Sequence, residues 1–161
     1  EEYRIFLVGE SGLRTTIKHV GFGVSQLLPI IVEGLRMPNN GCLILEQPEI
    51  HLHPKLQSSL FDFLYGLTLQ GKTVIVETHS DHLITRMRRR IAEDKINVMS
   101  QNINLTFIES NRKNSIFTRL DLDELGTLEY FPKDFVDPGS SEIREIVSAQ
   151  MKKRLADFGK K

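Results

Sequence analysis

The apolar positions in the middle of the chain follow two different spacings. Residues 42–46 and 73–77 are short, branched apolar runs, which are typical of buried strands in a parallel sheet. Residues 25–36 and 54–69 carry apolar side chains at helical spacing, and a third helix is expected from residue 80 or 81 to about residue 93. Because strands and helices alternate here with short connections, the pattern predicts an α/β fold with a parallel sheet and a right-handed crossover.

Individual residues define two of these helices more closely. In the first helix, Ser25 at the N-terminus suits an N-cap, a functional role or both, and we expect Pro29 to fall in the first turn, where a missing N–H is tolerated. The second helix is expected to open at Pro54. Its predicted buried stripe consists of Leu56, Leu60, Phe63, Leu64 and Leu67.

The character of the sequence changes after residue 103. After this point we expect an antiparallel hairpin over residues 104–120, a turn-rich stretch over residues 122–139 and a final amphipathic helix over residues 140–158. One further strand is predicted near the start of the chain, at residues 3–8. We therefore expect a parallel-sheet α/β part over residues 1–103 and a small α+β appendage over residues 104–161.

Polar side chains are concentrated where the two apolar strands stop. The first strand leads into Glu46, Gln47 and Glu49, and the second leads into Thr-His-Ser at residues 78–80. Neighbouring parallel strands deliver such side chains to a common site at their carboxyl ends. Carboxylates and a histidine there suit a magnesium–triphosphate site, where charge must be neutralised and a water oriented.

Composition narrows the class of protein. The 161 residues are enough for one domain with a real core, and the zero net charge gives no overall attraction to nucleic acid or an anionic membrane. Cys42 is the single cysteine, so no internal disulfide can form; we expect it to be a buried core residue in a cytoplasmic protein. The longest apolar stretch, residues 27–32, is too short to span a bilayer.

Three motifs, in order, resemble those of ABC-type ATPases. Gly-Phe-Gly-Val-Ser-Gln at residues 21–26 looks like the signature segment, residues 43–49 resemble Walker B, and Glu-Thr-His-Ser at residues 77–80 resembles the histidine switch. Their wording is similar to bacterial ATPases of the AAA/SMC-like kind, related to the overcoming-lysogenisation-defect and chromosome-maintenance ATPases. The resemblance runs from residue 20 to about residue 146, and residues 126–137 look like the small C-terminal domain that many of them carry.

The resemblance implies ATP and Mg²⁺ as cofactors and assigns roles to particular positions. Glu46 would hold magnesium as a hard oxygen ligand, and His79 would sense the γ-phosphate. Ser25, with Gly23 and Gln26 beside it in the signature, would contact a nucleotide held by a second subunit.

Two further implications concern the second subunit. His53 would lie near the nucleotide, in a segment, residues 51–53, through which two head-to-tail subunits communicate. The fold implied is the C-terminal lobe of a P-loop NTPase.

Gln47 departs from the general ABC pattern, which places the catalytic glutamate directly after the magnesium carboxylate. Glutamine can orient a water but is not a base. Either hydrolysis is slow, or Glu49 supplies the missing carboxylate two residues later.

The phosphate-cradling loop is the larger gap. Residues 9–16 follow a strand and resemble such a loop in part, but they lack its Gly-Lys-[Ser/Thr] ending, and Arg14 is not at the place of the lysine. We expect the loop to lie on an upstream segment of a longer polypeptide. The chain would then be inactive alone.

Other classes remain open at this stage. His51, His53, His79 and His82 form two close pairs that a metallohydrolase could use, and Asp121 with Asp123 superficially fits a Toprim-like nuclease. A non-hydrolysing nucleotide-sensing module is a third alternative, because Gln47 replaces the base.

The basic run at residues 86–90 bears on possible partners. Its arginines spread around a helix, so we expect most to be solvated or paired with acidic residues; nucleic-acid contact is the minority interpretation. The function expected is ATP binding and slow hydrolysis that drives head-to-tail homodimerisation and controls an effector protein, in antiphage defence or DNA maintenance. No membrane partner is expected.

Overall fold

The computed structural model describes residues 6–9, 11–16, 21–96, 98–111 and 114–128. The predicted final helix over residues 140–158 lies outside them. The chain forms two compact units, Glu1–Met87 and Arg88–Lys161. The expected division after residue 103 remains a prediction.

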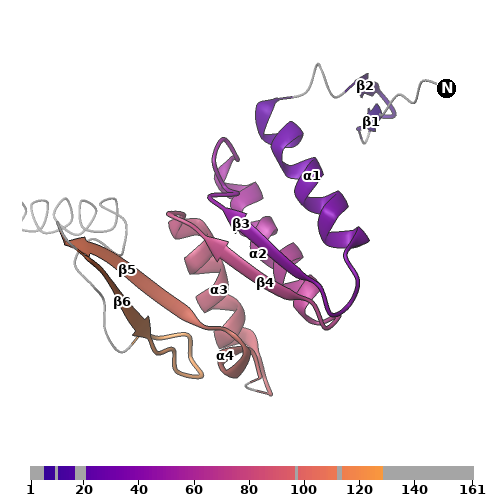
Figure 1. Cartoon of the computed structure of the whole chain (residues 1–161). Helices are drawn as coiled ribbons and strands as arrows, with labels where there is room; N and C mark the ends of the chain where they lie inside the picture. The colour runs from indigo at the N-terminus through magenta and orange to yellow at the C-terminus, as the bar shows by residue number, and fades with distance from the viewer. Residues whose placement is uncertain (1–5, 10, 17–20, 97, 112–113, 129–161) are drawn as a thin grey trace, which may run out of the picture. The chain divides into compact units, whose positions relative to one another are not determined.

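The first unit is built on a parallel strand pair. Strands β3 (Cys42–Glu46) and β4 (Thr73–Glu77) run side by side in the same direction, and helix α2 (Pro54–Thr68) connects them and packs against β4 (Figure 1). Helix α3 (Asp81–Glu93) follows β4. The predicted α/β order of strand, helix, strand and helix is therefore confirmed, and a parallel pair joined by a helix is the arrangement that such an order favours.

The two faces of the β3–β4 pair differ in burial. Leu43, Leu45 and the corresponding valines of β4 are half-buried, whereas Ile44 is 66% and Ile75 52% exposed among the described residues. Cys42 shares the open face and is exposed, so its prediction as a core residue is wrong. The cause is the period of two along a strand, which places alternate side chains on opposite faces.

Helix α1 (Phe22–Arg36) begins three residues earlier than predicted. Gly21 is its N-cap, so Ser25 lies inside the helix and the interpretation of Ser25 as an N-cap is wrong. Pro29 is likewise an interior residue and not part of the first turn. A proline there cannot donate the helical hydrogen bond to the carbonyl four residues earlier, which is that of Ser25.

Contacts with a neighbouring loop explain the early start of α1. The Phe22 ring meets the His51 ring edge-to-face, with centroids 4.9 Å apart. At Gly23, an added Cβ would lie 2.6 Å from the His51 carbonyl oxygen. Tertiary packing here overrides the low helix propensity of the Gly-Phe-Gly sequence.

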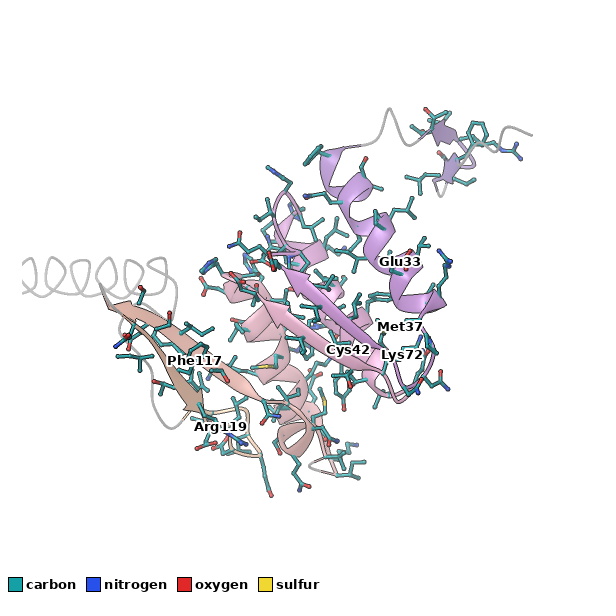
Figure 2. The ribbon with its side chains drawn as sticks, in the orientation of Figure 1. Glu33, Met37, Cys42, Lys72, Phe117 and Arg119 are labelled. Carbon is teal, nitrogen blue, oxygen red and sulfur yellow. The ribbon has the colours of Figure 1, made fainter. Side chains whose placement is uncertain are left out.

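The end of α1 is fixed by a buried lysine. Lys72, which is 5% exposed, donates from Nζ to the Gly34 carbonyl at 2.7 Å. A cation at the last turn of a helix complements the helix dipole and satisfies a terminal carbonyl. Figure 2 shows Lys72 and Cys42 at the amino-terminal ends of β4 and β3, close to the end of α1.

Helix α2 supplies much of the core of the first unit. Its buried side chains are Leu60, Phe61, Leu64 and Leu67, while Leu56 and Phe63 are half-buried. The burial of Phe61 was not predicted. Its ring stacks with that of Tyr65, with the ring centroids 6.1 Å apart. Full burial of each leucine is worth about 1.5–3 kcal/mol.

A short antiparallel hairpin occupies the amino-terminal part of the described chain. Strands β1 (Phe6–Val8) and β2 (Arg14–Thr16) pair, and the Gly9 N–H donates to the Leu13 carbonyl at 3.1 Å across the turn. The turn uses Gly12 at a φ of 77°, which glycine adopts without steric cost.

The second unit contains the predicted hairpin. Strands β5 (Leu105–Asn111) and β6 (Asn114–Leu120) pair antiparallel, after the short helix α4 (Met99–Asn102) (Figure 1). Asp94 accepts from the Val98 and Met99 N–H groups at 2.8 Å each. No helix in the described ranges is long and apolar enough to cross a membrane.

Candidate functional site at the carboxyl ends of β3 and β4

The β3–α2 loop, residues 47–53, holds a strained backbone next to the predicted site. Gln47 and His51 have φ angles of 45° and 64° although neither is glycine. The Gln47 N–H donates to the Glu77 carbonyl at 2.8 Å and so extends the parallel ladder beyond β3. Non-glycine residues in the left-handed region cost about 1–3 kcal/mol each and occur often at functional sites.

Glu46 and Glu77 lie opposite each other at the last register position of the strand pair. Both side chains are exposed. Adjacent strands are about 4.8 Å apart, so the pair brings two negative charges together on one face. A hard cation would relieve this repulsion, and Glu77 is the member of the pair that sequence reasoning did not single out.

Glu49 differs from Glu46 because it is buried. It is only 6% exposed, and its Oε1 accepts a hydrogen bond from the His79 backbone N–H at 2.8 Å. Its Oε2 is also buried and has no hydrogen-bond partner in the structure. The structure therefore brings Glu49 and His79 together through the backbone of His79, while the His79 side chain is exposed.

Gln57 is a residue of this site that sequence reasoning missed. From the first turn of α2, its Nε2 donates to the Leu52 carbonyl at 2.9 Å. Its Oε1 accepts from the Ser80 hydroxyl at 2.5 Å, and Ser80 Oγ in turn accepts from the Leu83 N–H at 3.1 Å. The only available signal was a polar residue bordering the apolar stripe of α2.

Of the signature residues 21–26, Gly23 packs directly against the β3–α2 loop. Gly23 allows α1 to pack against the carbonyl of His51 and the side chain of Leu52, which leaves no room for a Cβ. Ser25 and Gln26 are half-buried. Within the described residues, no hydrogen bond joins the buried Gln26 Oε1 to any other group.

The two histidines of the β3–α2 loop lie at the start of α2. His53 is the N-cap and accepts from the Lys55 N–H through Nδ1 at 3.3 Å. His51 is exposed and contacts Phe22. Across the described residues, no three His, Cys, Asp or Glu side chains gather into a possible metal site.

Neither glycine-rich segment has the form of a phosphate loop. Residues 9 and 11–16 belong to the turn and second strand of the β1–β2 hairpin, whereas a phosphate loop follows a strand and opens a helix. Residues 66–73 match the spacing Gly-x-x-x-x-Gly-Lys-Thr, which sequence reasoning overlooked, but they join the end of α2 to the start of β4.

The position of Lys72 shows that residues 66–73 are not a phosphate loop. A phosphate-loop lysine must reach a ligand, but the Lys72 side chain is buried against Gly34. It also precedes the amino-terminal end of β4, about 16 Å of extended chain away from Glu77. The match is therefore a coincidence of spacing.

The residues proposed for other functions have structural partners. Asp123 accepts from the Leu125 and Thr127 N–H groups at 2.9 and 2.6 Å, as an ordinary turn residue. In the basic run, Arg86 pairs with Asp62 at 2.6 Å, while Arg89 and Arg90 both pair with Glu93. The expected pairing of these arginines with acidic residues is confirmed.

A known protein family matches the first part of the chain. Residues 1–84 match the AAA ATPase domain family, which is a family of P-loop NTPases. The chain belongs to this family. A comparison with curated proteins finds no match. The AAA ATPase domain implies ATP binding and hydrolysis, and its match covers the carboxyl ends of β3 and β4 with Glu46, Gln47, Glu49 and His79.

The donor set fits one side of an AAA ATPase site. Glu46 is an exposed carboxylate, and magnesium in NTPases needs only one or two protein carboxylates besides the phosphates. His79, two residues beyond the partner strand's Glu77, is also exposed, and its ring can donate a hydrogen bond. The described residues contain no phosphate-binding loop. The side chains at the strand ends therefore suit only the part of an ATPase site that contacts the metal and the γ-phosphate.

Proposed function

We propose that the chain forms the magnesium and γ-phosphate side of an ATPase that hydrolyses ATP slowly. The observation that carries the proposal is the in-register parallel pairing of β3 with β4, which places Glu46 and Glu77 opposite each other and His79 two residues beyond. The phosphates themselves are bound by a segment other than residues 9–16 or 66–73. Bound magnesium would supply charge neutralisation at the transferring phosphoryl group.

Each candidate residue has a defined task in this proposal. Glu46 holds the metal, directly or through water. Gln47 orients the attacking water without removing its proton, and His79 donates a hydrogen bond to the γ-phosphate. The absence of a base at position 47 makes hydrolysis slow.

Dimerisation is the second part of the proposal. A head-to-tail homodimer would place Gly23, Ser25 and Gln26 of one subunit near the nucleotide of the other, with His53 at the subunit boundary. The cytoplasmic dimer would control an effector protein, in antiphage defence or DNA maintenance. The exposed His51 and Phe22 rings, in contact at the start of α1, support a role of this surface in subunit contact.

Multiple-turnover phosphate release by the full-length protein tests the proposal. The variant Glu46→Ala is expected to lower kcat by about a hundredfold or more, since several kcal/mol of charge stabilisation depend on the metal. The control is Glu33→Ala, whose exposed pair with Arg36 on α1 contributes little. Equal turnover in Glu46→Ala and the unmodified protein would exclude Glu46 as the metal ligand.

A nucleotide-sensing module is the second candidate, and the amide at Gln47 favours it. Such a module would bind Mg·ATP and dimerise but release no phosphate over many turnovers. Continued phosphate release after the first turnover separates the two functions.

A further inference from the structure

We propose that Glu49 and Gln57 are positioning residues. Their hydrogen bonds, which we call ties, connect His79 and its neighbour Ser80 to the β3–α2 loop. The inference rests on the proposed role of His79 as the γ-phosphate sensor. It concerns residues 78–80, the β4–α3 segment, and the loop on which His51 and His53 lie.

The first tie is the hydrogen bond from the His79 N–H to Glu49 Oε1, 2.8 Å long. A buried N–H that loses its acceptor is costly, so this bond holds the His79 backbone against Glu49. Glu49 is 94% buried, as the 6% exposure implies, and one of its two oxygens is already used by the backbone. A general base must reach a water, so this geometry suits positioning of His79 better than proton abstraction.

The second tie runs through Gln57. Its amide joins the Leu52 carbonyl to the Ser80 hydroxyl, so the residue after His79 and the residue before His53 are held by one side chain. Ser80 also caps α3 through the Leu83 N–H. Gln57 therefore bonds to the β3–α2 loop at Leu52 and to the β4–α3 segment at Ser80. Together with the Glu49 bond, it connects the same two segments at adjacent residues, His79 and Ser80.

The consequence is that the β4–α3 segment and the β3–α2 loop move as one body. A shift of His79 on contact with the γ-phosphate is transmitted to the segment that carries His51 and His53. The strained φ angles at Gln47 and His51 show that the surrounding contacts over-determine this loop. A network of buried polar bonds is suited to such transmission, because each lost bond leaves a buried group unpaired.

The test compares Glu49→Gln, Glu49→Ala and Gln57→Ala in the full-length protein, each with and without His79→Ala. The Gln side chain at position 49 can still accept from the His79 N–H, so we expect Glu49→Gln to keep kcat within about threefold. Glu49→Ala and Gln57→Ala should lower kcat about tenfold with KM nearly unchanged, and neither should add to the loss caused by His79→Ala. The matched control is Gln70→Ala, an exposed glutamine in the loop after α2.

Hydrogen exchange at the His79 amide provides a second readout that needs no nucleotide. Exchange should accelerate about tenfold or more in Glu49→Ala but not in Glu49→Gln or Gln70→Ala. An equal loss of kcat in Glu49→Gln and Glu49→Ala would identify Glu49 as the base and overturn its positioning role. If the losses of kcat in Gln57→Ala and His79→Ala are additive in the double variant, Gln57 does not act through His79 and its positioning role is overturned.

These outcomes are distinct from failure of the proposed function. If the full-length protein releases no phosphate, the proposed ATPase is wrong. The exchange measurement still tests the bond between Glu49 and the His79 amide. Unchanged exchange of the His79 amide in Glu49→Ala would contradict this bond.

Discussion

Glu46 and Glu77 face each other at the last paired position of two parallel strands, and both carboxylates are exposed. Two like charges at one register position destabilise a strand pair unless a cation or a partner neutralises them. Replacing one of them should therefore stabilise the fold while it damages the site. We expect Glu46→Gln to raise the melting temperature of the metal-free protein slightly, by a stability gain of about 0.2–1 kcal/mol, and to weaken magnesium-dependent nucleotide binding.

Differential scanning calorimetry with and without magnesium checks this expectation. In the unmodified protein, added Mg²⁺ with nucleotide should raise the melting temperature by mass action. A metal-free Glu46→Gln protein that melts below the unmodified one would show that the carboxylates do not repel each other in the fold.

Gln47 stands where the general pattern has a catalytic glutamate. We expect Gln47→Glu to raise kcat about a hundredfold, because a positioned general base contributes about 10²–10⁴-fold. Steady-state phosphate release measures the effect, with Gln70→Glu as the control for added charge. No gain in Gln47→Glu would mean that proton abstraction does not limit the reaction.

Lys72 distinguishes a structural lysine from a phosphate-loop lysine. We expect Lys72→Met to destabilise the protein by about 1–3 kcal/mol, because the Gly34 carbonyl loses its buried donor. Urea unfolding measures the loss, and Lys95→Met, at an exposed lysine, is the control. The KM for ATP should stay unchanged. A large rise of KM in a folded Lys72→Met protein would instead place residues 66–73 at the phosphates.

Gly23 tests the packing between α1 and the β3–α2 loop. An added Cβ would lie 2.6 Å from the His51 carbonyl oxygen, so Gly23→Ala should destabilise the protein by about 1–3 kcal/mol. At Gly66, within α2, a Cβ would meet nothing within 4 Å, and Gly66→Ala should stabilise by about 0.5–1 kcal/mol. Thermal unfolding of the two variants compares them directly; stabilisation by both would show that α1 does not approach the loop so closely.

Asp94 gives a pH dependence with a definite sign. Hydrogen bonds from the Met99, Ile96 and Val98 N–H groups hold the pKa of this carboxyl below its ordinary value of 3.8. Because the folded-state pKa is lowered, the stabilisation is present above the unfolded-state pKa and is lost as the pH falls through the folded-state pKa. An NMR titration of the Asp94 carboxyl carbon should show a midpoint below 3.8, whereas a midpoint at or above 3.8 would contradict these hydrogen bonds.

The sequence predicted the fold best where a local signal and the hydrophobic period agreed. Pro54 opens α2, Ser80 caps α3, and the bounds of β3 and β4 are those predicted. The start of α1 was missed because its contact with His51 lies about thirty residues away in sequence and outweighs the propensity of Gly-Phe-Gly.

The candidate site was predictable in its chemistry but not in its connections. The strand ends predicted where Glu46 and His79 would gather, because parallel strands present their carboxyl ends together. Burial of Glu49 could not be predicted, since a carboxylate at a strand end is normally solvated. Gln57 carried no motif, and only the structure shows that its amide connects Leu52 with Ser80.

The central claim is that nucleotide binds at the carboxyl ends of β3 and β4. Hydrogen–deuterium exchange of the full-length protein, with and without magnesium and a non-hydrolysable ATP analogue, tests it most directly. The account predicts slower exchange in residues 46–53 and 78–80, and no change in residues 66–73 at the opposite end of the strands. Protection of residues 66–73 with none at residues 46–53 or 78–80 would contradict it.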